Sequence, residues 1–64
     1  MKLREFLNMY DNWNVMVCVN DDNLDLIIHG KPEVVLSYKD TYQKEVVSFG
    51  FYDNELCVRV KDVE

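Results

Sequence analysis

The strongest constraint on the fold is an alternation of apolar and polar side chains in the last third of the chain. Segment 45–51 places Val47, Phe49 and Phe51 on one side, and segment 56–61 places Leu56, Val58 and Val60 on one side. Successive side chains of a β-strand point to opposite faces of the sheet, so this pattern indicates two strands with one face on a core. Asp53-Asn54 supplies turn residues between them, and the pair predicts a hairpin.

A second hairpin is predicted earlier in the chain. Val15, Val17 and Val19 alternate within 14–20, and Leu24, Leu26 and Ile28 alternate within 24–29. The residues between these segments, 20–23, are all Asn or Asp, which favour turns because their side chains bond the nearby backbone.

Helices are expected in two places. In 2–10, an apolar stripe recurs at helical spacing, formed by Leu3, Phe6, Leu7 and Tyr10. A short helix is predicted from Pro32 to Lys39, because proline fits the first helical position, and a polar connection is predicted for 40–44.

These elements predict one α+β domain spanning residues 1–64, with the order α-β-β-α-β-β. The expected architecture is a four-stranded antiparallel sheet, formed by the two hairpins, with the helices packed on one face. A domain of this size buries only roughly 60% of its unfolded surface, so its stability is marginal. We therefore expect self-association as a dimer.

The two cysteines lie in apolar, strand-like segments, where a reduced thiol behaves as a small hydrophobe. The first residues, 1–5, contain an acid and no long apolar run, so no secretory signal is expected. A cytoplasmic location with reduced thiols is the interpretation. A disulfide or a shared metal between Cys18 and Cys57 stays open, since the fold can bring them together across strands.

Charge and composition argue against several classes of function. The chain has 12 acidic and 7 basic side chains, a net charge of -5, which opposes binding to nucleic acid and to anionic membranes. No stretch approaches the ~18 apolar residues of a membrane span. The one histidine, His29, has no nucleophile or base grouped with it, and neither a glycine-rich phosphate loop nor a zinc motif is present. We expect a protein without catalytic residues, metal or cofactor, which acts by binding.

Two surfaces are candidates for contact with a partner. The first is acidic: if the hairpins lie side by side, their turns share one edge and form a negative patch that imitates nucleic acid. Its residues are Asp21, Asp22, Asp25, Asp53 and Glu55. A weak Ca²⁺ site at 21–25 is an alternative, although the glycine and closing glutamate of an EF-hand loop are missing.

The second candidate surface is the sheet face away from the helices. Apolar side chains are expected there, and an exposed apolar patch indicates an interface with a partner or a second copy. Its predicted residues are Met16, Cys18, Ile27, Val46 and Cys57, with Trp13 and Tyr52 at the rim.

In style, the chain resembles small acidic accessory proteins of phages and mobile elements of Gram-positive bacteria. The resemblance rests on a helix that opens with Met1-Lys2-Leu3, a Val-rich strand ending in an acidic turn, His29-Gly30-Lys31, and a closing pair of strands, Val46-Val47-Ser48 with Leu56 to Val60. It implies an inhibitor of a host defence protein, such as an anti-CRISPR protein.

Three functions follow as hypotheses. The first is a non-catalytic protein-binding module that blocks a host protein. The second is an oligomeric sponge for a small molecule or nucleotide signal, with local positive charge from Lys31, Arg59 and Lys61. The third is a purely structural, oligomerising accessory protein.

Overall fold

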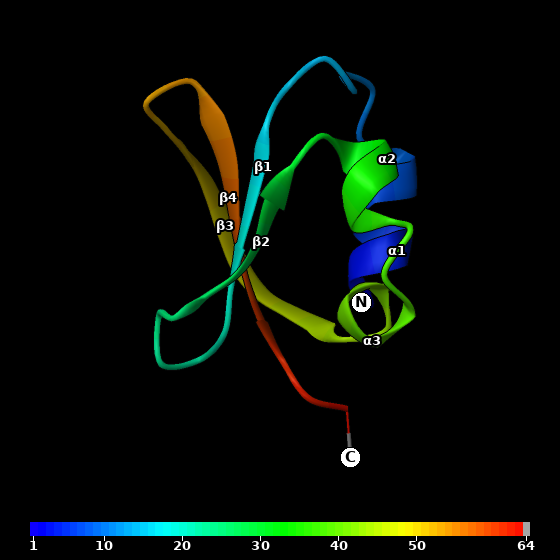
Figure 1. Ribbon diagram of the computed structural model, residues 1–64, viewed down its shortest axis with the longest axis vertical. Coiled ribbons are helices and arrows are strands. Elements are labelled where there is room, and N and C mark those ends of the chain that lie inside the picture. The colour runs from blue at the N-terminus through cyan, green and yellow to red at the C-terminus, as the bar shows by residue number, and fades with distance from the viewer. Residues whose placement is uncertain (64) are drawn as a thin grey trace.

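The computed structural model describes residues 1–63 and shows one four-stranded sheet with its helices on a single face (Figure 1). The predicted α+β class is confirmed. The elements in chain order are α1 (Leu3–Met9), β1 (Val17–Asn20), β2 (Leu26–Gly30), α2 (Pro32–Val35), α3 (Lys39–Tyr42), β3 (Glu45–Tyr52) and β4 (Glu55–Lys61).

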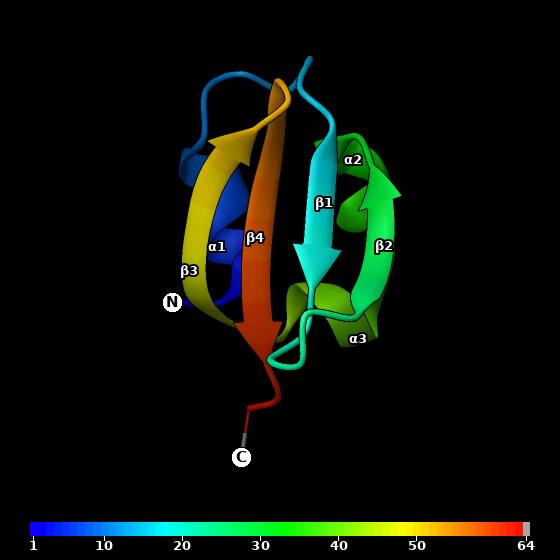
Figure 2. The ribbon, with the colours of Figure 1, turned by 90° about the vertical axis from the view of Figure 1, so that its left-hand side faces the viewer.

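Both predicted hairpins form, but the sheet is mixed, so the expectation of a purely antiparallel sheet is wrong. The strand order is β2-β1-β4-β3, and the inner strands β1 and β4 run parallel (Figure 2). Parallel neighbours need a long crossover connection. Residues 21–54 provide one, because β2, both short helices and β3 all lie between β1 and β4 in the chain.

The core lies between the inner strands and the helices. Its fully buried Leu and Val side chains each contribute roughly 1.5–3 kcal/mol relative to exposure. They are Val17 and Val19 of β1, Leu56, Val58 and Val60 of β4, Leu3 and Leu7 of α1, and Val35 of α2. The central pair of strands is therefore the part of the sheet that the helices cover best.

The first helix matches its prediction to within one residue at each end. The Glu5 carboxylate accepts the Lys2 backbone N–H at 3.0 Å, which satisfies a donor at the start of the helix. At the other end, the Trp13 indole N–H donates to the Leu7 carbonyl at 3.0 Å. This hydrogen bond holds Trp13 on the helix side of the sheet. The prediction that Trp13 lies at the rim of the opposite sheet face is therefore wrong.

The single helix predicted from Pro32 to Lys39 is instead two four-residue helices, and the second occupies the predicted polar connection. The Ser37 hydroxyl donates to the Val34 carbonyl at 2.6 Å, and Tyr38 adopts an extended backbone with φ -108° and ψ 100°. Side-chain bonds of this kind compete with helical hydrogen bonds, which explains the break.

Two irregularities in strand register change which side chains face the core. One lies in β2 opposite Val19 and Asn20 of β1, where Ile27 has no partner in register. As a result, Ile27 packs against the core. The other lies between Val46 and Ser48, and it aligns Val46 with buried Val60. The predictions that Ile27 and Val46 point away from the helices are therefore wrong, since each bulge shifts the alternation by one residue.

Candidate functional site

The two acidic turns lie at opposite ends of the sheet (Figure 2). Because β1 and β4 are parallel, the turn that follows β1 and the turn that precedes β4 cannot share an edge. The predicted negative patch joining Asp21, Asp22 and Asp25 to Asp53 and Glu55 is therefore wrong. Glu55 instead belongs to β4 and lies 3.0 Å from His29, between Oε2 and Nε2.

One carboxylate of the turn after β1 stabilises the backbone of that turn. Asp21 Oδ1 accepts the backbone N–H groups of Asn23 at 2.8 Å and Asp25 at 3.0 Å. Such bonds are the usual role of aspartate in turns, so Asp21 needs no cation to explain its position.

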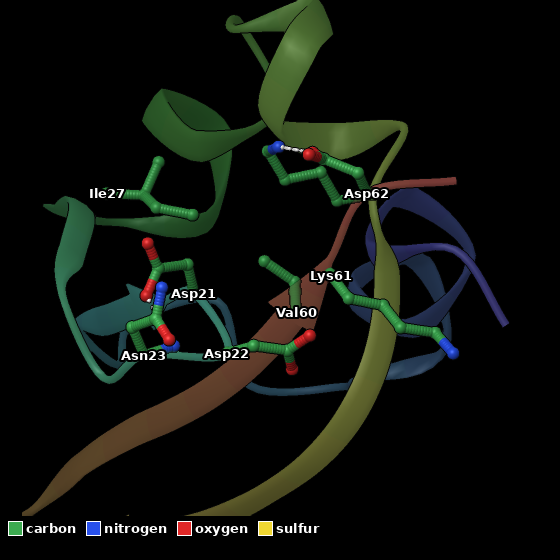
Figure 3. Close-up of a pocket in the computed structure, with 8 residues that line it drawn as sticks. Asp21, Asp22, Asn23, Ile27, Val60, Lys61 and Asp62 are labelled. Atoms are coloured by element: carbon green, nitrogen blue, oxygen red, sulfur yellow. Dashed lines mark hydrogen bonds and ion pairs between the residues drawn. The ribbon is translucent and has the colours of Figure 1, made fainter. Parts of the chain in front are cut away.

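This turn borders a hollow of about 460 Å³ whose far side is formed by the end of β4 (Figure 3). Lys61 and an ion pair between Lys44 and Asp62 also line it. The hollow thus contains charges of both signs rather than the single-sign field of a nucleic-acid mimic. Within residues 1–63, no three His, Cys, Asp or Glu side chains are arranged to hold a metal ion.

The sheet face away from the helices carries three of the predicted apolar residues. Met16, Cys18 and Cys57 lie on it, half-buried, and Cys18 and Cys57 are in-register neighbours on β1 and β4 with free thiols. Burial raises the pKa of the Cys57 thiol, and the adjacent Cys18 thiol raises this pKa further. The strands also place polar and charged residues on this face, among them Asn20, His29, Glu55 and Arg59, so it is not the broad apolar patch that we predicted.

An exposed apolar cluster lies instead on the helix side, where α1 meets β3. We call it the aromatic patch, and its residues are Phe6, Met9, Tyr10, Phe49 and Phe51. The ring centroids of Phe6 and Phe49 are 4.7 Å apart, and those of Tyr10 and Phe51 are 6.0 Å apart. Phe49 is nevertheless 62% exposed, Phe51 54% and Met9 66%. A hollow of about 200 Å³ lies between Phe6, Met9, Tyr10 and Phe49.

The patch adjoins β3, which is one of the two edge strands of the sheet. The N-terminal residues cover only the start of this edge: Val46 N–H donates to the Met1 carbonyl at 2.8 Å, and Leu3 N–H donates to the Lys44 carbonyl at 2.8 Å. From Val47 to Tyr52 the strand contains neither proline nor a charged side chain, which are two of the usual protections of an edge, and its bulge lies only at the start of this segment, between Val46 and Ser48. The free part of β3 and the aromatic patch together form the candidate site.

Sequence reasoning missed this site because it assigned Phe49 and Phe51 to the core. Both rings do point to the core side, in register with Val58 and Leu56, but α1 has only seven residues and leaves them half uncovered. The available signal was three large rings within four residues, Phe49, Phe51 and Tyr52, beside so short a helix.

Comparison of the chain with family models, with curated proteins and with solved structures finds no match. No helix in residues 1–63 has the length and apolar character needed to cross a membrane.

Proposed function

We propose that this protein is a non-catalytic protein-binding module that accepts an extended segment of a partner as an added strand beside β3. The observation that carries the proposal is the coincidence of an unprotected sheet edge with an exposed aromatic patch. In strand addition, backbone hydrogen bonds supply affinity, and pockets for alternate side chains supply specificity.

The hollow of about 200 Å³ between α1 and β3 supplies such a pocket. It is lined by Phe6, Met9, Tyr10 and Phe49, which are apolar or aromatic. A large apolar side chain of the added strand, pointing to the helix side, would lie over these residues. Aromatic and methionine side chains are also enriched at interfaces, which fits their exposure here.

Charge favours a basic partner. The chain has a net charge of -5, and the acids Glu45 and Asp53 bracket β3. Lys or Arg on both sides of the apolar segment would complement these ends. A second copy fits less well, because a symmetric antiparallel pairing centred on Phe49 would bring Glu45 of one copy near Asp53 of the other, and these two acids repel.

The resemblance to phage accessory proteins would make the partner a host protein. The module would inhibit this host protein by pairing β3 with an extended strand of the host protein or with the strand-binding edge of the host protein. Steric blocking is favoured over imitation of nucleic acid, because the acidic turns are at opposite ends of the sheet. The alternative of a structural dimer is separated from this proposal by the experiment below.

The test is selection from a yeast-displayed library of short random peptides against the folded chain. Selected peptides should alternate apolar and polar residues between basic flanks, and they should bind more weakly at about 0.5 M salt because charge is screened. Phe49→Lys should weaken binding about tenfold or more. The matched control is Leu26→Lys, since Leu26 is 60% exposed and lies on the opposite edge strand.

Peptides that bind Phe49→Lys as tightly as the parent chain would refute the β3 site. Light scattering across a concentration series identifies the other occupant. A mass of two chains that is lost in Phe49→Lys would make the added strand a second copy and overturn the assignment of a foreign segment.

A further inference from the structure

Arg59 is a basic residue of β4 on an acidic protein. It lies on the sheet face away from the helices, in register between Asn20 of β1 and Ser48 of β3. Among residues 1–63, its guanidinium makes no ion pair, and its Nε is buried without a hydrogen-bond acceptor. A buried donor without a partner is unfavourable, so a native structure that keeps one calls for an explanation.

Arg59 lines a hollow of about 270 Å³ on this face. Its polar lining residues are Arg59, Asn20, Ser48 and Tyr52, and within residues 1–63 Arg59 is the one charged residue that lines it. Leu24, Phe49, Gly50, Cys57 and Val58 complete the lining. Concave sites with a few convergent polar groups in an apolar surround are the usual form of small-molecule sites.

Gly50 gives the Tyr52 ring its place in this hollow. A Cβ on Gly50 would lie 3.1 Å from Tyr52 Cε2 and 3.2 Å from the Tyr52 hydroxyl oxygen. The ring therefore lies over the glycine, with its hydroxyl end close to the strand. Since Gly50 is the in-register neighbour of Cys57, the ring edge and the Arg59 guanidinium border the same space.

We propose that this hollow binds a small, singly charged oxyanion joined to a flat apolar group, with Arg59 recognising the anion. A guanidinium fork pairs with two oxygens of a carboxylate or phosphate, and among residues 1–63 Arg59 has no carboxylate partner that would compete with such a ligand. The Tyr52 ring, which lines the hollow, offers aromatic surface to the remainder of the ligand. A single lining cation, on a chain with a net charge of -5, favours one negative charge over several.

The test is an NMR titration of the folded chain with four probes. Benzoate and adenosine 3′,5′-cyclic monophosphate each join one negative charge to a ring, as a carboxylate and as a phosphodiester. Acetate and inorganic phosphate are bare anions. Saturable chemical-shift changes at the backbone amides of Ser48, Gly50 and Arg59 are expected with at least one ring-bearing probe. Binding of benzoate would identify a carboxylate site, and binding of the cyclic nucleotide would identify a phosphodiester site.

Matched variants show whether Arg59 recognises the ligand or only adds to the overall charge. Arg59→Gln should weaken binding about tenfold or more. Lys61→Gln removes the same charge two residues along the same strand and should leave binding unchanged. If Arg59→Gln does not fold, Arg59→Lys keeps the charge without the planar fork and should still lose affinity.

Three results would overturn the proposal. Equal losses in Arg59→Gln and Lys61→Gln would indicate general electrostatic attraction. Bare anions that bind as tightly as the ring-bearing probes would indicate an adventitious ion only. No saturable shift with any probe would leave the hollow without this function, and the proposed strand site at the β3 edge would be unaffected.

Discussion

Replacing either glycine with alanine makes the same chemical change in two strands of one sheet, yet we expect opposite effects on stability. Gly30 in β2 and Gly50 in β3 both have negative φ, so neither backbone excludes an L-residue. A Cβ on Gly30 would lie 3.1 Å from Val34 Cγ1 and 3.3 Å from Val34 Cβ. A Cβ on Gly50 would meet only the outer end of the Tyr52 ring, at 3.1–3.3 Å.

The magnitudes follow from what each neighbour can do. Either substitution gains about 0.4–1 kcal/mol by restricting the unfolded chain. The exposed Tyr52 ring can rotate away, so Gly50→Ala keeps that gain. Val34 Cβ is fixed to the backbone of α2, which packs on β2, and overpacking of this kind costs about 1–3 kcal/mol. Gly30→Ala should therefore be destabilising by about 1 kcal/mol net.

The assay is urea denaturation of the parent chain and both variants, with thermal melting as a second measurement. For a domain of this size, 1 kcal/mol corresponds to about 4–8 °C in melting temperature. Gly50→Ala should melt higher than the parent and Gly30→Ala lower. Destabilisation by Gly50→Ala of more than about 1 kcal/mol would refute the conclusion that a Cβ on Gly50 meets only a ring that can move away. Stabilisation by Gly30→Ala would refute the close contact between β2 and α2.

Two further predictions concern a strained turn residue and a thiol. Leu24 has a left-handed backbone with φ 66° and is 68% exposed, so Leu24→Asn should raise the free energy of unfolding by about 1 kcal/mol in urea denaturation, whereas no gain would contradict the strain. Burial and the Cys18 thiol raise the pKa of Cys57 above its ordinary value of 9.0 in the folded chain, so the folded state holds this proton to higher pH than the unfolded state. This pKa difference contributes to the free energy of unfolding, and the contribution is fully present below the ordinary pKa. It is lost as pH rises from the ordinary pKa through the raised pKa of the folded chain. Urea denaturation from about pH 7 to about pH 10 should show a steeper loss for the parent chain than for Cys57→Ser, and equal slopes would disprove the effect.

The sequence predicted what depends on neighbouring residues. Each hairpin needs only an alternating pair of segments and a turn, and both formed within about two residues of expectation at most strand ends. The largest difference was the start of β1, predicted at Asn14 and found at Val17. The parallel pairing of β1 with β4 joins residues nearly 40 positions apart, such as Cys18 and Cys57, and local periodicity contains no signal for it.

Most of the misplaced site residues follow from two physical causes. A bulge changes the face of every residue beyond it, and nothing in the pattern around Val46 or Ile27 marks one. The acidic patch failed for a different reason, because the end of the sheet at which each turn lies depends on the direction of the inner strands. The candidate surfaces were therefore wrong where they required tertiary information, although most of the residue alternation behind them was correct.

The two proposed sites share β3 and use mainly its opposite faces, and Phe49 lines both hollows. Phe49 and Phe51 point to the helix side and form the aromatic patch, whereas Ser48, Gly50 and Tyr52 lie on the other face beside Arg59. A strand added to the free edge would fix the twist of β3 and with it the distance between Tyr52 and Arg59. If partner binding changes the affinity of the hollow for an anion, the anion must change partner affinity by the same factor. Peptide titrations with and without a saturating ring-bearing anion would measure this coupling, and equal affinities in both would show that β3 holds two independent sites.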